Sequence, residues 1–483
     1  MTPTWAPAAT GTVVHMTQLS SPPAIRPVPG PPIDARARRD DSVRLAAGAA
    51  LWLSLLLVVW WWLTGGGIAD LGGWATALQS LGRVTGLVAA VLLLAQVVLM
   101  ARVPVLERAY GQDRLVRIHR LVGLTSFDLM VAHVVLITWG YAAGSVTATP
   151  ATLWDLVVNY PGMLLAAAGT LCLVMVVVTS VRAARRRLRY ESWHLMHLYA
   201  YLGVGLAIPH QLWTGADFTS SPGRQVFWWS AWAASAGSVL VWRVGLPLWR
   251  NLRHDLRVAA VVPEAPGTVS VHVTGRDLHR LPVEAGQFLT WRFLGRPGRT
   301  RANPYSLSAA PDGRSLRITV QDVGDGSGTV AGLPVGSRVW AEGPYGRLSP
   351  RARRNGKLLL IGAGVGITPL RALAEGLSYA PGEAVLLHRW SDVPLFADEL
   401  IGLARRRGLV AWGIPGPRRS ADSWLGEGVE APSDLAALTA WVPDVAERDV
   451  YLCGPTPWTD LVVRDLRAAG VPDQHIHLES FGW

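Results

Sequence analysis

The chain has 483 residues, of which 50% are hydrophobic and only 16% are charged, and its mean hydropathy is positive. The net charge of +11 comes almost wholly from arginine, because Lys357 is the only lysine. Only Cys172 and Cys453 occur, which excludes a disulfide framework, a cysteine-based zinc site and a four-cysteine iron–sulfur cluster. The basic charge is not accompanied by a zinc-finger or RNA-binding motif, so nucleic acid is not an expected partner.

Residues 1–43 are rich in proline, alanine and threonine and contain no uninterrupted apolar core. A signal peptide needs such a core, and a packed domain needs more apolar side chains. The composition therefore predicts a disordered tail on the cytoplasmic side.

Six apolar segments follow, each of about the ~20 residues that a helix needs to cross a bilayer. Buried core helices of a soluble protein are the alternative, but six such segments in series favour a six-helix transmembrane bundle over 44–248. The expected spans are 44–64, 82–101, 118–140, 162–181, 192–213 and 225–248.

Arginine clusters flank these segments on one side only. They lie before the first span, between the second and third, between the fourth and fifth, and after the sixth. The alternate loops carry only Arg83 and Arg224, at their edges. Because cytoplasmic loops carry the excess of positive charge, both termini and everything after residue 250 are predicted to be cytoplasmic, in a multi-pass protein of the plasma membrane.

Five of the twelve histidines fall in two spans: His119 and His133 in the third, and His194, His197 and His210 in the fifth. An ionisable side chain inside a bilayer is costly and indicates function. A single such histidine is as readily explained by a hydrogen bond to a neighbouring helix, but five confined to two spans favour a shared role.

The histidine spacing matches between the two spans. His119 and His133 are 14 residues apart, which is ~21 Å of helix, and His197 and His210 are 13 apart, ~20 Å. Two facing helices would thus offer two histidine pairs at two depths, which suits two b-type haems with axial imidazoles. An ideal helix would leave His210 about 140° from His197, so a kink at Pro209 is expected to re-aim it. His194 is an alternative to His197 as the inner ligand.

The segments "LGRVTGLVAAVLLLAQVVLMARVPVLERAYGQDRLVRIHRLVG" and "WHLMHLYAYLGVGLAIPH" resemble the ferric reductase-like transmembrane haem family, which includes NADPH oxidases and ferric-chelate reductases. The resemblance implies that His119 pairs with His197 and His133 with His210. It also implies that Arg83 approaches the outer haem and the electron acceptor, although a simple interfacial arginine is an equal alternative.

After the apolar segments, the pattern of expected secondary structure changes twice. Short alternating strands separated by glycine and proline turns predict an antiparallel β-barrel over 255–350. From Lys357 strands alternate with helices, which predicts an α/β domain with a parallel sheet over 356–483.

The turn "GAGVGITP" follows a buried strand and opens a helix. Glycines at such a turn let backbone amides approach a pyrophosphate, and the helix N-terminus favours its charge. A tight turn without a ligand explains the pattern equally well when it is taken alone. The residues concerned are Gly362, Gly364, Gly366, Thr368 and Pro369.

The motifs "NPYSLSAAP", "GDGSGTV", "EGPYG", "GAGVGITP", "YLCGP" and "ESFGW" occur in the order found in ferredoxin–NADP reductase-like flavoproteins. This resemblance implies FAD. By it, Ser306 lies near the reactive flavin nitrogen, and Asn303 stands where many members have arginine, which leaves Arg301 as a candidate for the FAD phosphates. The implied flavin-lining residues are Pro304, Tyr305, Ser306 and Leu307, and the implied pyrophosphate contacts are Gly326, Ser327, Gly328 and Thr329.

The same resemblance places Cys453 beside the nicotinamide ring, with Gly454 and Pro455 shaping the turn, although a buried structural cysteine is the alternative. A C-terminal aromatic covers the flavin in this family, and Phe481 matches best, with Trp483 as competitor. A 2′-phosphate on the nucleotide calls for arginines, for which Arg389 and Arg418 or Arg419 are candidates, so NADPH is favoured over NADH. In a chain so rich in arginine, solvated surface side chains are nearly as good an explanation.

These parts predict a transmembrane oxidoreductase that passes electrons from NAD(P)H through FAD and two haems to an outer acceptor, either dioxygen or a ferric or cupric ion. A flavin suits the junction because it accepts two electrons and releases them singly. The alternatives are a membrane-anchored flavin reductase without haem and a haem-binding membrane sensor or carrier.

Overall fold

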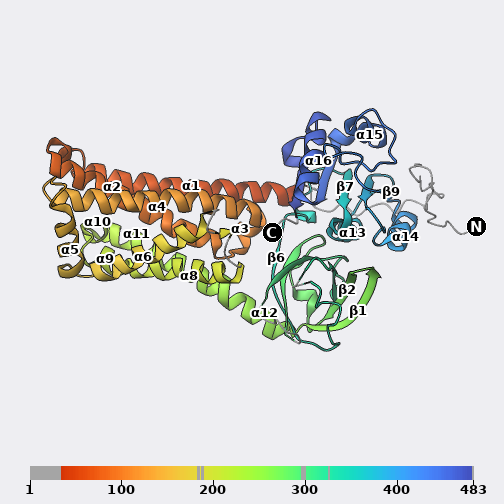
Figure 1. Ribbon diagram of the computed structural model, residues 1–483, viewed down its shortest axis with the longest axis horizontal. Helices are drawn as coiled ribbons and strands as arrows, with labels where there is room; N and C mark the ends of the chain where they lie inside the picture. The colour runs from red at the N-terminus through yellow and green to blue at the C-terminus, as the bar shows by residue number, and fades with distance from the viewer. Residues whose placement is uncertain (1–33, 182–184, 187–189, 295–300, 325–326, 481–483) are drawn as a thin grey trace, which may run out of the picture. The chain divides into compact units, whose positions relative to one another are not determined.

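The computed structural model describes residues 34–480, apart from 182–184, 187–189, 295–300 and 325–326 (Figure 1). The chain divides into two compact units. A helical unit contains Val43–Leu106 and Gln112–Gly245, and a second unit contains Leu246–Trp483 with Glu107–Gly111 and the segment that ends at Ser42.

Four helices are long and apolar enough to cross a membrane: α1 (Ala35–Thr64), α2 (Trp74–Met100), α4 (Gln112–Tyr141) and α6 (Met163–Ser180). Large apolar side chains on them point outward, such as Leu121, which is 68% exposed. Such exposure has no advantage in water and is what a lipid-facing surface requires. The expectation of a membrane protein is therefore confirmed.

The fifth and sixth expected spans are helical but interrupted. The fifth comprises α8 (Tyr190–Leu206) and α9 (Ile208–Trp213), with the break at Ala207, two residues before Pro209. The sixth comprises α11 (Pro222–Ser238), a π-helical turn (Val239–Gly245) and α12 (Leu246–His254). Within the described residues only four continuous spans are present, so the six-helix count is not confirmed.

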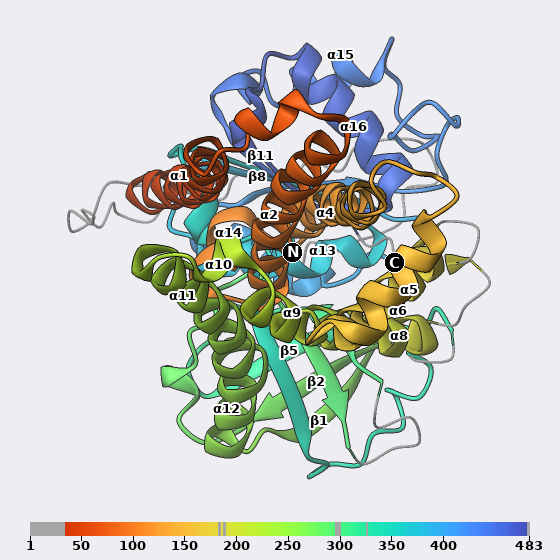
Figure 2. The same cartoon turned by 90° about the vertical axis from the view of Figure 1, so that its left-hand side faces the viewer.

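Within the helical unit, α2 packs along α4 and α6 packs along α8 (Figures 1 and 2). Glycines permit the second contact: a Cβ on Gly169 would lie 2.6 Å from the carbonyl oxygen of Gly203, and one on Gly203 would lie 2.9 Å from that of Gly169. Small residues of this kind let membrane helices approach closely. Short helices complete the unit: η1 (Ala69–Gly72), α5 (Thr149–Asn159) and α10 (Ala216–Thr219). Most of α3 (Pro104–Tyr110) belongs to the second unit.

The predicted tail of residues 1–43 is wrong at its C-terminal end, because α1 begins at Ala35. Asp40 is 2% exposed and accepts hydrogen bonds from Nε and Nη2 of Arg351, and Asp41 pairs with Arg354 at 2.8 Å. These partners lie more than 300 positions away in the sequence, so composition could not reveal them. Residues 1–33 lie outside the described part of the chain.

Two antiparallel three-stranded sheets form the first part of the second unit. Their orders are β1-β2-β5 and β4-β3-β6, and they share one core that includes Val271, Trp291 and Ile318. Antiparallel strands were expected and are present, but the predicted barrel is not confirmed, because the two sheets are not closed into one. Besides the shared core, isolated bridges such as Leu307↔Ile318 connect the described strands of the two sheets. The strands are β1 (Arg257–Ala265), β2 (Thr268–Thr274), β3 (Phe288–Phe293), β4 (Asn303–Ser306), β5 (Ser315–Gln321) and β6 (Val339–Tyr345).

The rest of this unit is a five-stranded parallel sheet in the order β11-β10-β7-β8-β9, as the βα pattern predicted. Separate apolar cores cover its two faces. The strand order changes direction between β7 and β10, where a parallel sheet of this kind offers a crevice at the carboxyl ends of its strands. The elements are β7 (Leu358–Ala363), α13 (Ile367–Gly376), β8 (Ala384–Arg389), α14 (Ala397–Arg407), β9 (Val410–Ile414), α15 (Asp434–Trp441), β10 (Asp449–Gly454), α16 (Thr456–Ala468) and β11 (Ile476–Ser480).

Candidate functional site

The first histidine pair is brought together by α4 and α8. The ring centroids of His119 and His197 lie 6.0 Å apart, with the ring planes at 65°. Nδ1 of His197 lies 3.3 Å from Oγ of Ser180, and the His194 side chain is close enough to interact with His197 electrostatically. His119 has the backbone of Gln96 as a polar neighbour, but its buried Nδ1 makes no hydrogen bond of normal geometry. Nδ1 of His119 is therefore available to a ligand.

The second pair joins α4 to α9. His133 places Nδ1 2.7 Å from the carbonyl oxygen of Gly82, and His210 places Nδ1 2.8 Å from Oγ1 of Thr214. The side chains of His133 and His210 lie close to each other. A carbonyl can only accept, so Nδ1 of His133 carries the proton and Nε2 is left free. This is the usual arrangement of a metal-ligating histidine, whose other nitrogen is held by an outer partner.

Glycines make room for the second pair. A Cβ on Gly86 would lie 2.5 Å from Nδ1 of His133, and a Cβ on Gly162 would lie 2.7 Å from the backbone nitrogen of His210. The sequence pattern drew attention to the histidines but not to these glycines. The repeat of Gly82 and Gly86 one helical turn apart was a signal that could have identified Gly86.

Arg83 is part of an ion-pair cluster. Its Nε lies 2.9 Å from Oδ2 of Asp217 and its Nη1 lies 3.2 Å from Oδ2 of Asp70. Arg224 also pairs with Asp217, at 2.9 Å, and donates to the carbonyl of Trp61. The prediction from sequence did not include these carboxylates. The arrangement differs from a lone interfacial arginine, because the cluster fixes the guanidinium in place.

In the second unit, the flavin-type motif forms β4 and the residues after it. Tyr305 and Ser306 pair with Leu289 and Phe288 of β3, and the carbonyl of Tyr305 accepts from Nε1 of Trp291 at 3.1 Å. Ser306 is 3% exposed, and its hydroxyl has no hydrogen-bond partner in the structure. A buried hydroxyl without a partner is costly, so its setting fits a ligand atom that would bond to it.

The other implied flavin contacts lie after β5. Oγ of Ser327 accepts from the backbone nitrogen of Val323 at 2.8 Å and lies 3.3 Å from Oδ1 of Asp322. A Cβ on Gly328 would lie 3.0 Å from the same carboxylate, so a glycine is favoured there. Gly326 lies outside the described residues.

The glycine turn joins β7 to α13 as expected. Gly364 has a positive φ of 55°, and a Cβ on Gly366 would lie 2.3 Å from the carbonyl oxygen of Cys453. The hydroxyl of Thr368 donates to the carbonyl of Val365, and Thr368 and Pro369 are buried in the first turn of the helix. The turn therefore brings backbone against the end of β10, which only glycine permits.

Cys453 is the penultimate residue of β10 and lies between Gly362 of β7 and Glu479 of β11. The thiol is fully buried, and burial followed by the charge of Glu479 raises its pKa well above the usual value. It is therefore a neutral thiol at neutral pH and not a nucleophile. The sheet also places Glu479, which the sequence pattern did not single out, next to Cys453. Gly454 packs against Trp458, and Pro455 is the N-cap of α16.

Among the arginines expected for a 2′-phosphate, Arg389 and Arg418 lie close to each other. Burial followed by the charge of Arg418 lowers the pKa of Arg389, whose Nη2 donates to the carbonyl of Gly416. Arg419 instead pairs with Asp434 at 2.7 Å and has a structural role. Arg301, the candidate for the FAD phosphates, has a polar, ionic or ring contact in the structure. Phe481 and Trp483 lie outside the described residues.

Among the described residues, no group of three or more His, Cys, Asp or Glu side chains forms a metal-ion site. The histidines thus come as pairs.

Known proteins resemble both the membrane segments and the flavin- and nucleotide-type motifs of this chain. Residues 85–208 match the family model described as ferric reductase like transmembrane component, a segment that contains all five of these histidines except His210. The resemblance predicted for the chain is confirmed. The chain resembles this transmembrane component over those residues, and it resembles ferredoxin reductases and flavohemoproteins over nearly half of its length.

The matches to the reductase module are of moderate identity. The chain is 34% identical over 240 residues to the ferredoxin reductase component of 3-ketosteroid-9-alpha-monooxygenase from Mycolicibacterium smegmatis, covering 47% of this chain and 65% of that protein. It is 35% identical over 249 residues to the flavohemoprotein of Pseudomonas aeruginosa strain PAO1, covering 48% and 60%. The matches thus span less than two thirds of each of these relatives.

Among solved structures, the chain is similar to the flavohem-like FAD/NAD binding domain of nitric oxide dioxygenase from Vibrio cholerae O1 biovar El Tor. The identity is 26% and the TM-score is 0.35, over 48% of this chain and 99% of that domain.

Proposed function

We propose that the protein is a membrane-embedded NAD(P)H-dependent oxidoreductase that carries electrons from a cytoplasmic nucleotide, with FAD and two b-type haems as cofactors, to an acceptor on the outer side. The observation that supports this most directly is the pairing of His119 with His197 and of His133 with His210 in a chain that also has a reductase module. Paired membrane histidines alone would fit a haem carrier, and the reductase module alone would fit a flavin reductase.

His119 and His197 would hold the inner haem, and His133 and His210 the outer one. Gly82 and Thr214 would hold the outer imidazoles with Nε2 free. A haem held by these residues would supply one-electron redox chemistry. Arg83, fixed by Asp70 and Asp217, would place a positive charge beside the acceptor.

In the reductase module, Pro304, Tyr305, Ser306 and Leu307 would line FAD, and Gly326–Thr329 would contact its pyrophosphate. FAD supplies the conversion of a two-electron hydride donor to one-electron acceptors. The glycine turn Gly362–Gly366 and the first turn of α13 would bind the nucleotide pyrophosphate, and Arg389 with Arg418 would favour NADPH. Cys453 would pack beside the nicotinamide as a neutral thiol, and Phe481 or Trp483 would cover the flavin.

We further propose six spans over 44–248, with the interrupted fifth and sixth segments completing the bundle, a FAD-binding domain over 255–350 and an NAD(P)-binding domain over 356–483. Proline and π-helical interruptions are tolerated in a membrane where neighbouring helices satisfy the freed backbone groups. The arginine asymmetry supports cytoplasmic termini in the plasma membrane.

Anaerobic reduction of the purified full-length protein tests the proposal. The protein in detergent should show flavin absorbance and a haem Soret band, and NADPH or NADH should reduce both. If dithionite reduces the haem but neither nucleotide does, the proposal is wrong. Absence of a Soret band would favour a flavin reductase without haem. Subsequent addition of dioxygen or of a ferric chelate, with reoxidation rates compared, identifies the acceptor.

Replacement of single histidines tests the ligand assignment. His210→Ala should lose about half of the bound haem, because an iron with one protein ligand is held weakly. His194→Ala is the matched control and should keep the haem content of the unmodified protein. Haem per polypeptide is measured by the pyridine haemochrome assay, and equal losses in the two variants would contradict the assignment.

A further inference from the structure

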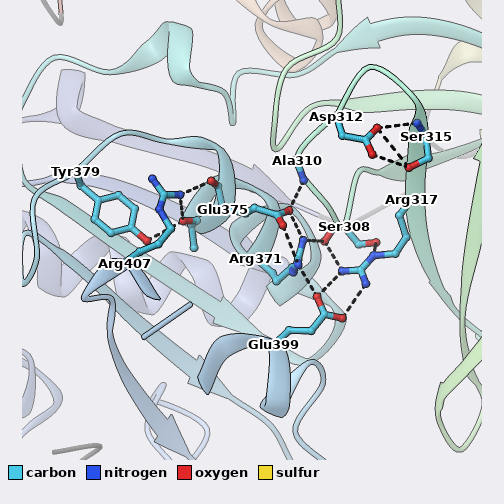
Figure 3. A network of polar contacts seen from close by, with 11 residues as sticks. Ser308, Ala310, Asp312, Ser315, Arg317, Arg371, Glu375, Tyr379, Glu399 and Arg407 are labelled. Carbon is cyan, nitrogen blue, oxygen red and sulfur yellow. Dashed lines mark hydrogen bonds and ion pairs between the residues drawn. The ribbon is translucent and has the colours of Figure 1, made fainter. Parts of the chain in front are cut away.

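Four charged side chains form a cluster between the flavin-type strand and the nucleotide-type helix (Figure 3). Arg317 lies on β5, Arg371 and Glu375 lie on α13, and Glu399 lies on α14. We call these residues the Arg–Glu cluster. Its two arginines and two glutamates balance in charge, and Arg371 is only 6% exposed. None of these residues has a role in the function proposed above.

Glu399 is the centre of the cluster. Its carboxylate accepts from Nη1 and Nη2 of Arg317 at 2.7 and 2.9 Å, and it lies 2.5 Å from Nη2 of Arg371. Burial opposes the charge of Glu399, but the two arginines outweigh it and hold the pKa of this carboxyl below its usual value. Glu399 therefore stays ionised at neutral pH and bridges strand β5 to helix α13.

The Arg–Glu cluster also binds the backbone just after the flavin-type strand. The carbonyl of Ser308 accepts from Nη2 of Arg317 at 2.9 Å and from Nη1 of Arg371 at 3.1 Å. Oε2 of Glu375 accepts from the backbone nitrogen of Ala310 at 2.7 Å. Ser308 is fully buried and lies two residues beyond Ser306. The segment that carries Ser306 is thereby tied to α13.

Helix α13 has little freedom to move on its own. It begins at the glycine turn, and at its other end a Cβ on Gly376 would lie 2.7 Å from Cβ of Ala285. Arg407 of α14 donates to the carbonyls of Ala374, Glu375 and Leu377 (Figure 3), which caps the C-terminal turn. Helix α14 thus holds α13 near its middle through Glu399 and at its end through Arg407.

We propose that the Arg–Glu cluster positions the nucleotide relative to the flavin, by tying α13, which follows the glycine turn, to the segment just after the strand that carries Ser306. The inference rests on the function proposed above. One hydride, two electrons with a proton, is lost by the nucleotide and gained by the flavin. Such a transfer needs the reacting atoms within about 3–3.5 Å, and a misplacement of about 1 Å costs up to ~10²-fold in rate. These side chains are positioning residues, since they act through backbone.

Glu399→Gln tests this role, because it removes the charge while keeping the size of the side chain. Glu399→Asp keeps the charge and serves as the conservative variant. The matched control is Asp444→Asn: Asp444 pairs with Arg448 at 2.6 Å and with Lys357 at 2.8 Å, and its side chain is 28% exposed against 32% for Glu399. Arg448 hydrogen-bonds to Leu358 at the opposite, amino end of β7.

The full-length protein in detergent is mixed anaerobically with NADPH, and the rate of flavin reduction is recorded. Glu399→Gln should be reduced about tenfold more slowly than the unmodified protein. Glu399→Asp should recover part of the rate, and Asp444→Asn should retain it. Flavin content and unfolding temperature should match those of the control. Without nucleotide, hydrogen exchange of the amides of Ser308 and Ala310 should speed up in Glu399→Gln only.

An unchanged rate of flavin reduction in Glu399→Gln would overturn the inference. A slower rate that comes with loss of flavin or with a lower unfolding temperature than the control would also overturn it, in favour of a purely structural role. If Glu399→Gln does not fold, Arg317→Lys, which keeps the charge but loses the two-pronged contact, takes its place with the same expected result. Failure of NADPH and NADH to reduce the unmodified protein would instead refute the proposed function.

Discussion

For the histidines in the helical unit, the tertiary structure decides which ring nitrogen is protonated. Spacing along the chain placed His119 and His133 at two depths, and their partners followed from the fifth segment. Which ring nitrogen of His133 is free is decided by the carbonyl of Gly82, 51 positions away in the sequence. The sequence can thus suggest that His133 is a ligand but cannot assign its tautomer, because the hydrogen-bond partner of the ring belongs to another helix.

Gly86→Ala tests this packing at the level of one methyl group. The added Cβ would meet the His133 ring at 2.5 Å and displace it from the Gly82 carbonyl. About half of the haem is expected to be lost, as in His210→Ala. Gly237→Ala, in α11, is the control, because nothing lies within 4 Å of its Cβ position and its haem content should not change. Haem per polypeptide is the measurement, and full retention in Gly86→Ala would contradict the placement of His133.

At the scale of elements, strands and apolar helices follow from local pattern, whereas interruptions and sheet closure do not. Pro209 marked a kink correctly, and the helix breaks at Ala207. The π-helical turn after Ser238 carries no comparable sequence signal. The barrel was expected from strand number and length alone. Closure depends instead on hydrogen bonds between edge strands far apart in the sequence, and only isolated bridges connect the two sheets.

The glycine turn makes a prediction at this scale. Gly366→Ala would put a Cβ 2.3 Å from the carbonyl oxygen of Cys453. Because this carbonyl is backbone and cannot rotate away as a side chain could, β10 and α13 would have to separate. We expect a loss of about 1–3 kcal/mol of stability together with weaker NADPH binding. Gly356→Ala, which has nothing within 4 Å, should affect neither. Unfolding temperature and nucleotide titration are the measurements, and unchanged NADPH affinity would argue against this turn as the pyrophosphate site.

For the molecule as a whole, buried histidines in the reductase module link stability to pH. His388 is 2% exposed, and burial, only partly offset by the Gly364 backbone, lowers its pKa to about 4. Burial likewise lowers the pKa of His477, despite its contact with Asp449. Both histidines are neutral in the folded protein. When the chain unfolds below about pH 6.5, they take up protons, because an unperturbed imidazole has a pKa of about 6.5.

Between about pH 4 and about pH 6.5, the unfolded chain therefore binds more protons than the folded chain. The contribution of these histidines to the free energy of unfolding should be constant above about pH 6.5 and should fall as the pH drops toward 4. The contribution of His388 is roughly 3 kcal/mol at the acid end of that window. Unfolding temperature measured against pH should fall less steeply for His388→Gln than for the unmodified protein. His279→Gln, at an exposed position, is the control and should leave the slope unchanged. Equal slopes for all three proteins would contradict a buried neutral His388.

The sequence by itself determined the features that depend on neighbours along the chain. Apolar length gave membrane helices, βα alternation gave the parallel sheet, and the ordered motifs gave the reductase resemblance. Tertiary structure decided the contacts between distant segments. Arg83 and Asp217 are 134 positions apart, and Arg317 and Glu399 are 82 apart. Their pairing depends on which helices and strands pack together, and in a chain with so many arginines no local pattern distinguishes a solvated side chain from one that holds a fold in place.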